Sequence, residues 1–333
     1  MTTYKIQFHL KSSIRTPFHA DTIFGHLCWA LRYKKGEDRL KEWLNSFNSS
    51  PTLISNAFKA GGFPRPMLPP MPLQELGKLK GFNPDALDLK TATILKGMKK
   101  IVFLNEEWIK EHQASFSNAA LSCHLFDLAA ERLAESKDEK RRTVKSIAIT
   151  HNTYDRLNGR VLEGSLYDWV ETFYLQPNGE PQTFWFLIRT ESLNKTEIEN
   201  MLEFVAFSGF GADKSIGKGQ IEIISINEEV LPKCPDANAF ISLSNFIPAS
   251  PKELNGFYQP ITKYGKLGGE WAAGRVPFKK PVIMLQAGAV IKDPDYSKVK
   301  TYGKLQAHIH RQKEIVHYGY AFPFPIYLKE EDE

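Results

Sequence analysis

Residues 207–219 read FSGFGADKSIGKG, with four glycines and two lysines between an apolar helical run and an alternating strand. Glycine adopts backbone angles that other residues avoid, and it lets another chain approach the backbone closely. Successive backbone N–H groups in such a loop form a concavity that binds anions, and lysines add positive charge. The stretch therefore predicts a helix–loop–strand unit whose loop binds a phosphorylated ligand. The alternative is a turn-rich connection that contacts no ligand.

Two common phosphate-binding loops do not fit this stretch. A P-loop requires Gly-x-x-x-x-Gly-Lys followed by Ser or Thr, after a strand and before a helix. Here the interval from Gly211 to Gly217 is one residue too long, and Gly219 stands where the magnesium-binding hydroxyl belongs. The dinucleotide fingerprint requires the same strand–loop–helix order, and Lys214 occupies the place of its third glycine. The chain is therefore not expected to be an ATPase or a dehydrogenase.

Length and composition indicate a protein with two domains and real hydrophobic cores. The chain has 333 residues, of which 42% are hydrophobic. Its three cysteines, Cys28, Cys123 and Cys234, are scattered without a Cys-x-x-Cys pair, which indicates a reducing compartment and neither disulfides nor a zinc site. The N-terminus alternates like a strand and has no signal-peptide pattern, and no apolar run approaches the ~18 residues that span a membrane. We expect a soluble cytoplasmic protein.

Positive charge is concentrated in parts of the chain. The formal net charge is +5, but residues 252–313 hold twelve Lys or Arg against four Asp or Glu, a local charge of +8. A second basic cluster lies within residues 140–145, whereas residues 330–333 are acidic. Local basic surface is the electrostatic pattern expected of a protein that binds nucleic acid. For any single lysine, an ordinary solvated surface position is the alternative.

Hydrophobic periodicity predicts most elements of the first two thirds of the chain. Alternation over residues 4–10 predicts a strand, and Asp21 is expected to cap the helix that follows. The turn sequence at 177–179, between strand-like runs at 166–175 and 183–189, predicts a hairpin. The other expected features are helices at 38–47, 106–112, 125–135 and 195–207, strands at 100–104 and 220–226, a helix stop at Gly36, an irregular proline-rich connection at 61–72 and an exposed charged stretch at 135–142.

The order of these elements predicts an α+β, ferredoxin-like fold with helices on one face of an antiparallel sheet and the other face free. Residues 1–230 are expected to form this domain, with an insertion at about 75–160. The proline-rich segment 232–235 predicts a boundary. Residues 231–333 are expected to form a smaller, strand-rich domain without a long amphipathic helix. Its expected strands are 239–243, 281–285 and 289–291.

Four blocks of sequence carry a resemblance to a known family. They are FHADTIFG at 18–25, HNTYDRL at 151–157 with EGSLY at 163–167, the glycine-rich loop through Gly219, and VHYGYAF at 316–322. In this order the chain resembles the RAMP superfamily of CRISPR proteins. Within that superfamily it is most similar to the fourth-subunit family of the Csm complexes, which caps the 5′ end of the guide RNA. The loop alone marks the superfamily, and its combination with the ADTxFG and YGYAF blocks is more specific.

The resemblance implies a tandem pair of ferredoxin-like (RRM-like) folds and an inserted thumb hairpin, which we place within residues 80–150. It implies that the ligand is the repeat-derived 5′ handle of the guide RNA. The implied neighbours are the large polymerase-like signalling subunit and the first backbone subunit of the filament. The implied role, in antiviral defence, is binding and assembly without a cofactor, while other subunits cleave RNA. One departure is His151, which stands where an arginine-like residue is expected.

The glycine-rich loop is the first candidate RNA-binding site. Its glycines Gly211, Gly217 and Gly219 are expected to let RNA approach the backbone. Lys214 and Lys218 are expected to contact phosphates, and Ser215 to donate a hydrogen bond. Phe210 is expected either to stack on a base or to anchor the loop in the core.

Two further segments supply candidate RNA-binding residues. His19 precedes a helix start, where phosphate binding is natural, and its alternative is a surface histidine. Asn152, Tyr154 and Arg156 alternate, so on an extended segment they share one face and form a platform for a single strand. Arg156 has the alternative of pairing with Asp155 or another nearby acid.

The sequence also offers a candidate metal site and two alternative functions. His308, His310 and His317 lack an accompanying cluster of Cys, Asp or Glu, so we predict no metal. The alternative enzyme is a RAMP endoribonuclease that processes the precursor guide RNA, with His19, His151 and Lys214 in the catalytic roles. The 114 residues that follow the glycine-rich loop and the ADTxFG block argue against it. A third possibility is a general RNA chaperone outside any complex.

Overall fold

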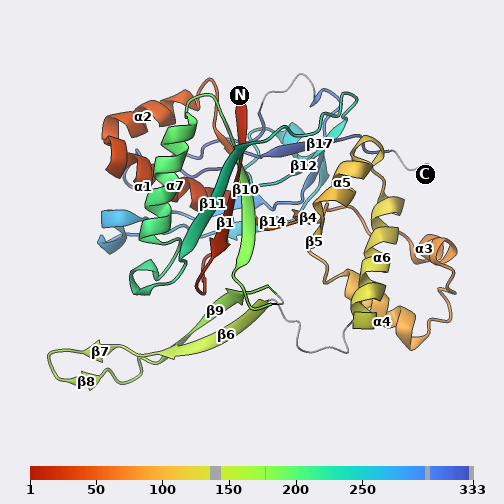
Figure 1. The fold of residues 1–333 in the computed structure, drawn as a ribbon, viewed down its shortest axis with the longest axis horizontal. Coiled ribbons are helices and arrows are strands. Elements are labelled where there is room, and N and C mark those ends of the chain that lie inside the picture. Colours follow the sequence, from red (N-terminus) through yellow and green to blue (C-terminus); the bar gives the residue numbers. More distant parts are fainter. Residues whose placement is uncertain (136–143, 177, 297–300, 330–333) are drawn as a thin grey trace.

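An antiparallel sheet with strand order β11-β1-β10-β2 forms the centre of the molecule (Figure 1). The computed structural model describes residues 1–135, 144–176, 178–296 and 301–329. Strand β1 pairs with β10 along its whole length and with β11 through a register shift at Gln7/Phe8. The strands of this sheet are β1 (Thr2–Leu10), β2 (Leu53–Ile54), β3 (Phe58–Lys59), which also pairs with β10, β10 (Gln182–Thr190) and β11 (Ile221–Glu228).

Three helices pack against one face of this sheet: α1 (Ala20–Lys35), α2 (Glu37–Ser46) and α7 (Lys195–Ser208) (Figure 1). The predicted apolar stripe of α1 is buried at Ile23, Phe24, Leu27, Ala30 and Leu31. It packs with the even-numbered residues of β1, because side chains alternate along a strand. These helices agree with the sequence predictions, and α7 begins with a complete capping box between Asn194 and Glu197.

The predicted start of α1 was wrong by two residues. The N-cap is His19, not Asp21, and the backbone N–H of Ala20 donates to Oδ1 of Asn56 at 2.8 Å. Asp21 therefore lies in the first turn, where a carboxylate stabilises the positive end of the helix. Its carboxylate pairs with Nζ of Lys263 at 3.2 Å.

The strand order is the ferredoxin order 4-1-3-2, but the second strand is not the predicted one. The short strands β2 and β3 pair with β10, so no edge of β10 is free for the run at 166–175. A single bridge, Leu175↔Pro181, joins that run to β10 near the predicted turn. Pro177 of the turn lies outside the described residues.

The run at 166–175 instead forms one arm of a projecting hairpin. Its strands are β6 (Val144–His151) and β9 (Tyr167–Tyr174), paired from Val144↔Tyr174 to His151↔Tyr167. A smaller pair, β7 (Tyr154–Asp155) with β8 (Arg160–Val161), extends it away from the sheet (Figure 1). The inserted thumb hairpin therefore exists, but it spans residues 144–174 and not the interval 80–150 where the sequence interpretation placed it.

The interval before the thumb is mainly helical. Its elements are β4 (Gly62–Pro64), α3 (Leu73–Lys80), α4 (Leu89–Met98), β5 (Phe103–Asn105), α5 (Glu106–His112) and α6 (Asn118–Glu135). The sequence predicted α5 and the second half of α6 but missed α3 and α4. Strand β4 lies within the connection predicted to be irregular and pairs with β5. Most of the charged stretch predicted at 135–142 lies outside the described residues.

A second antiparallel sheet, of order β13-β16-β12-β17, repeats the ferredoxin order. From residue 231 on, the described helical residues form only short 3₁₀ turns. A separate hairpin joins β14 and β15. The bounds are β12 (Ala239–Ser242), β13 (Gly256–Phe257), β14 (Pro260–Lys263), β15 (Val282–Leu285), β16 (Val290–Lys292) and β17 (Pro323–Ile326).

The two sheets share a core. Trp185 and Leu187 of β10 belong to one buried cluster with Ile241 of β12 and Phe324 of β17. The hydroxyl of Tyr318 accepts a hydrogen bond from the backbone N–H of Ile54 at 2.7 Å. The face of the first sheet that was expected to be free is therefore covered along β10. In the described parts of the chain, no helix is both long and apolar enough to cross a membrane.

Candidate nucleic-acid interface

The glycine-rich loop begins where α7 ends and is anchored by Phe210. Gly209 stops the helix at φ 79°, and its N–H donates to the carbonyl of Val205. The ring of Phe210 is only 3% exposed and lies 4.7 Å from the ring of Phe18. Its backbone N–H donates to the carbonyl of Gly219 at 2.8 Å. The prediction that Phe210 stacks on a base is therefore wrong, because the ring anchors the loop in the core.

Two of the glycines bring the loop against its own chain and not against a ligand. A Cβ at Gly211 would lie 2.6 Å from Cβ of Thr16, whose hydroxyl accepts the N–H of Ala212 at 2.9 Å. A Cβ at Gly219 would overlap the carbonyl oxygen of Phe210. Gly217, at φ 86°, has open space around it. Only Gly217 of the three thus keeps its predicted accessibility to RNA.

The side chain of His26, on α1, contacts the glycine-rich loop. The backbone N–H of Gly211 donates to its Nε2 at 2.9 Å, and its ring stacks on Phe210 at 4.5 Å. Burial, with a smaller effect of the nearby Lys214 charge, lowers the pKa of His26 to about 3. The imidazole is therefore neutral, and a bond accepted at Nε2 assigns its proton to Nδ1.

Lys218 has an internal partner. Its Nζ lies 2.6 Å from Oε2 of Glu171, a thumb residue whose side chain is 1% exposed. The same carboxylate accepts a hydrogen bond from Oγ of Ser13 at 2.6 Å. Burial raises the pKa of Glu171, but the bonds from Lys218 and Ser13 outweigh it and leave the pKa lowered. Lys218 therefore compensates a buried carboxylate and is not the free ammonium group that a phosphate contact requires.

The segment after β1 joins the loop to the base of the thumb. Arg15 forms an ion pair with Asp213 of the loop, and its guanidinium lies 3.6 Å from the centre of the Trp169 ring on β9. A bridge between Ile14 and Thr172 closes the same junction. The loop, residues 13–16 and the thumb base therefore form one continuous surface, which lies where the thumb leaves the sheet (Figure 1).

The tip of the loop remains open. Lys214 is partly buried, which lowers its pKa, and no described acidic side chain lies within ion-pair distance of it. Ser215 is exposed. The loop amides before Asp213 and after Ser215 donate hydrogen bonds within the protein. The amides of Asp213, Lys214 and Ser215 have no partner among the described residues. Three successive amides beside a lysine are the kind of arrangement that binds an oxyanion.

His19 lies at the N-terminus of α1 but is engaged internally. Its Nδ1 lies 2.9 Å from Nζ of Lys263, so it accepts that bond. Burial first, and then Lys263, lower the pKa of His19 to about 4. The Asp21 carboxylate links the same lysine to Nε2 of the buried His317, 3.7 Å away. His19 thus joins α1 to β14. The phosphate contact predicted for His19 would have to form while Lys263 engages Nδ1.

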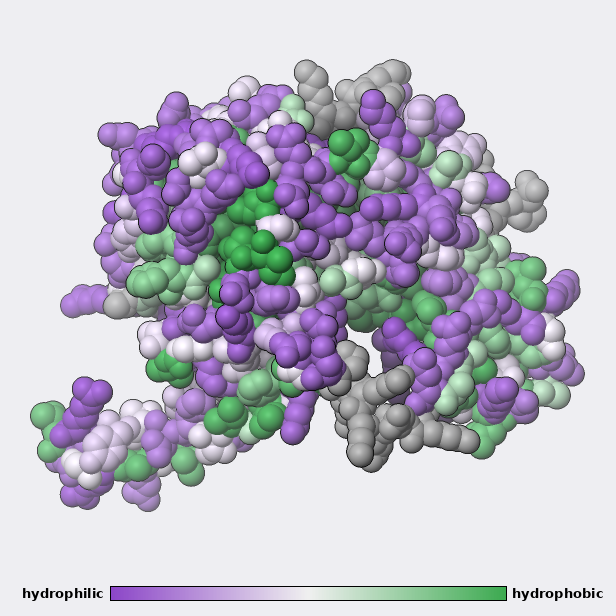
Figure 2. Space-filling view, in the orientation of Figure 1, coloured by the Kyte–Doolittle hydropathy of each residue, from purple (hydrophilic) through white to green (hydrophobic). Residues whose placement is uncertain are grey.

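The candidate residues of the thumb lie at its outer end. Tyr154 is 57% exposed, and Asn152 and Arg156 are exposed too. Arg156 lies in the turn after β7, so the three do not share one extended face as predicted. Asp155 bonds with Asn158 and the N–H of Leu157, not with Arg156. Figure 2 shows hydrophobic and hydrophilic side chains mixed along this hairpin.

The three histidines considered for a metal serve different contacts. His308 is exposed, Nε2 of His310 lies 2.9 Å from the carbonyl of Val276, and His317 is buried beside Asp21. Among the described residues, no three His, Cys, Asp or Glu side chains are grouped to hold a metal ion.

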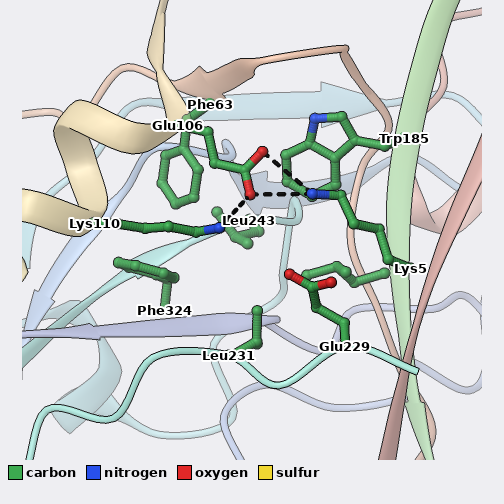
Figure 3. Close-up of a pocket in the computed structure, with 10 residues that line it drawn as sticks. Lys5, Phe63, Glu106, Lys110, Trp185, Glu229, Leu231, Leu243 and Phe324 are labelled. Atoms are coloured by element: carbon green, nitrogen blue, oxygen red, sulfur yellow. Dashed lines mark hydrogen bonds and ion pairs between the residues drawn. The ribbon is translucent and has the colours of Figure 1, made fainter. Parts of the chain in front are cut away.

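The cavity in Figure 3 lies beside a group of ion pairs that connects two elements of the fold. Oε1 of Glu106 pairs with Nζ of Lys5 at 3.1 Å and with Nζ of Lys110 at 2.8 Å, and Trp185 and Phe324 line the space beside them. Both lysines are thus paired with Glu106, and the Lys5–Glu106 pair ties α5 to β1, whereas the Lys110–Glu106 pair lies within α5.

Sequence reasoning missed Arg15, Thr16, His26 and Trp169. The available signal was topological. Leu10 at the end of β1 pairs with Ile221 at the start of β11, so the segment after β1 must pass the loop that precedes β11.

The chain matches one family model and is similar in fold to several solved structures. The family model described as RAMP superfamily matches residues 10–222. No curated protein sequence matches the chain. Similar folds occur in the structure described as "Crystal structure of Csm1-Csm4 cassette in complex with AMPPNP" (TM-score 0.57, 19% identity, covering 99% of this chain and 100% of that one). They also occur in "Crystal structure of Csm3-Csm4 subcomplex in the type III-A CRISPR-Cas interference complex" (TM-score 0.56, 15% identity, 98% and 99% covered). At this identity the match establishes a shared Csm4-like fold.

Proposed function

The chain belongs to the RAMP superfamily, and from that premise we propose that it is a non-catalytic subunit of a type III-A CRISPR effector complex in the cytoplasm. It binds the 5′ handle of the guide RNA and links the large polymerase-like subunit to the backbone filament. The observation that carries the proposal is the open loop tip, where Lys214 lies beside three amides that have no partner among the described residues. Arg15 and Trp169 join this tip to the thumb base.

The geometry suits a single RNA strand. Free amides and a lysine bind phosphates, and such contacts fix the position of a strand without reading its sequence. The thumb adds exposed aromatic and basic side chains at Tyr154 and Arg156. Aromatic side chains bind unpaired bases by stacking. A strand held at the loop would therefore meet the thumb as it continues.

The neighbouring structures support the proposed partners. Chains of the same fold occur in complexes described as containing Csm1 and Csm4, and Csm3 and Csm4. The likeness in fold spans nearly all of both chains, which supports similar partners for this protein. We propose a large Csm1-like subunit and a Csm3-like backbone subunit as its direct partners.

The positions of the alternative catalytic residues support a binding role. Nδ1 of His19 is engaged by Lys263, and the ring of His151 stacks on Tyr167 at 5.6 Å on the thumb. Lys214 lies on the glycine-rich loop. A general base must offer a free nitrogen to the proton that it removes, and the bond from Lys263 occupies Nδ1 of His19.

The experiment measures binding of handle RNA to the purified protein by fluorescence anisotropy, with a scrambled RNA of equal length as the reference. We expect preference for the handle, weaker binding by Lys214→Ala, and no cleavage of repeat RNA without magnesium. Co-purification with co-expressed Csm1-like and Csm3-like subunits tests the partners. Equal binding of both RNAs, or specific cleavage lost in His19→Ala, would overturn the proposal.

A further inference from the structure

The β14–β15 hairpin continues beyond its two strands as a longer ribbon. The strands pair from Pro260↔Leu285 to Lys263↔Val282. Beyond them, the N–H of Lys279 donates to the carbonyl of Gly265 at 2.8 Å, and Lys266 and Phe278 form a bridge. One face of the ribbon is internal, because Val282 and Met284 are buried. Side chains alternate between faces, so the intervening residues point to solvent.

The outer side of this ribbon is both aromatic and basic. Tyr264 is 74% exposed and Phe278 61% exposed. Nζ of Lys266 lies 5.9 Å from the centre of the Phe278 ring. We use the name hairpin strip for the five exposed side chains Tyr264, Lys266, Arg275, Phe278 and Lys280.

The cations of the hairpin strip have no ion-pair partner in the part of the chain that the structure describes. No described acidic side chain forms an ion pair with Lys266, Arg275 or Lys280, whereas the nearby Glu270 pairs with Arg32 at 2.8 Å. The strip lies within residues 252–313, the segment with a local charge of +8. Exposed aromatic rings next to unpaired cations complement the bases and phosphates of a single strand. A protein partner fits less well, because the cores of protein interfaces are depleted in lysine.

The strip adjoins the surface described above. Lys263, which precedes Tyr264, donates to His19 on the inner side of the hairpin. Three residues before His19, the hydroxyl of Thr16 accepts the N–H of Ala212 in the glycine-rich loop. Residues 16–19 therefore connect the loop to the hairpin that carries the strip.

We propose that the hairpin strip is a second contact for single-stranded RNA, continuous with the glycine-rich loop. Tyr264 and Phe278 stack on bases, and Lys266, Arg275 and Lys280 contact phosphates. The inference rests on the proposed function, because the strand that the loop holds is the one that reaches the strip.

The test uses fluorescence anisotropy with three single-stranded RNAs: the handle alone, the handle extended by ten nucleotides, and an unrelated RNA of the longer length. Two double variants remove the strip's rings (Tyr264→Ala with Phe278→Ala) or its charges (Lys266→Ala with Lys280→Ala). Matched controls are Tyr33→Ala and Lys34→Ala with Lys35→Ala, which change exposed residues of α1. Thermal melting checks that every variant folds.

We expect the ring variant to bind the extended RNA about 25-fold more weakly or worse, because each of the two stacked bases contributes at least about fivefold. The charge variant should lower the slope of log affinity against log salt by about 1.4, or about 0.7 for each phosphate contact. The controls should bind like the wild type.

Each result is assigned to one proposal. If Lys214→Ala weakens handle binding but folded strip variants bind every RNA normally, the strip inference is overturned and the proposed function stands. If the wild type shows no handle preference but the strip variants lose affinity for the unrelated RNA, the proposed function fails and the strip is an RNA site. If strip variants keep RNA affinity and lose co-purification with a protein subunit, the strip is a protein interface and the inference is wrong.

Discussion

The backbone N–H of Gly211 donates a 2.9 Å hydrogen bond to Nε2 of His26, a residue of α1 that lies 185 positions earlier in the chain. The imidazole also stacks on Phe210, the anchor of the loop. The glycine-rich loop is thus shaped by the helix beneath it as well as by its own glycines. A substitution in α1 can therefore change the loop tip without contacting a ligand.

Replacing His26 tests this dependence. His26→Ala leaves the N–H of Gly211 without its acceptor, which costs about 1 kcal/mol, the lower end of the range for buried donors, because this hydrogen bond is partly buried. We expect faster hydrogen exchange across residues 209–219 and weaker binding of handle RNA. His26→Gln offers an amide oxygen as an acceptor and should restore part of both. Unchanged exchange in a folded His26→Ala protein would show that the other contacts of the loop hold it without His26.

Three histidines give the fold a predictable response to acid. Burial is the first cause that lowers the pKa of His19 to about 4, of His26 to about 3 and of His317 to about 4, from 6.5. Below pH 6.5 the unfolded chain binds protons that the folded protein does not. The free energy of unfolding therefore decreases as the pH is lowered. The contribution of the neutral histidines to the free energy of unfolding is fully present above pH 6.5. It is lost progressively as the pH falls from 6.5 to the folded pKa values.

Urea unfolding between about pH 7.5 and pH 5 measures this loss, since most carboxylates titrate lower. His26→Gln removes one of the titrating groups, so its stability should fall less steeply over this interval than that of the wild type. Equal slopes for the two proteins would mean that His26 is accessible to protons in the folded state.

The two lysines of the loop should differ in their contribution to RNA binding. Lys214 has no described ion-pair partner, whereas Lys218 pairs with Glu171. Lys214→Ala should therefore reduce the slope of log affinity against log salt by ~0.7, the amount expected for one phosphate contact with a single strand. Lys218→Ala should change the slope less. Equal reductions would indicate that Lys218 exchanges its carboxylate for phosphate when RNA binds.

Local patterns predicted the elements that carry their own periodicity. Strand β1 and helices α1 and α7 were predicted because their apolar residues recur at the period of the element. Strands β2 and β3 have two residues each, too few to show alternation, so the sequence assigned the second strand to the run at 166–175. That run does alternate, but it pairs with β6 in the thumb. Pairing is decided by tertiary structure, which a local pattern does not contain.

The candidate site, like the fold, was predicted only in part. The glycines at 211, 217 and 219 did signal a tight loop with positive φ angles. Their neighbours, Thr16 beside Gly211 and Phe210 beside Gly219, depend on how the segment after β1 packs. The partner of Lys218 is 47 residues away on another element, so no local motif reports it.

The Lys218–Glu171 pair itself gives a final test, because it joins the loop to the thumb. Lys218→Met leaves a carboxylate that is 1% exposed and that keeps, among the described side chains, the hydrogen bond from Ser13. Removing one member of a buried pair costs about 3–5 kcal/mol, and the partial exposure of Lys218 reduces the expected loss to about 2 kcal/mol. The exposed pair Lys11–Glu222 is the control, and Lys11→Met should cost about 0–1 kcal/mol.

Adding Glu171→Gln to Lys218→Met removes the uncompensated charge, so the double variant should be more stable than Lys218→Met alone. Urea unfolding of the wild type, both single variants and the double variant gives the coupling energy. If the double variant is less stable than Lys218→Met by the full cost of Glu171→Gln, the two side chains act independently. The thumb base would then be held by Ser13, Arg15 and Trp169 without the ion pair.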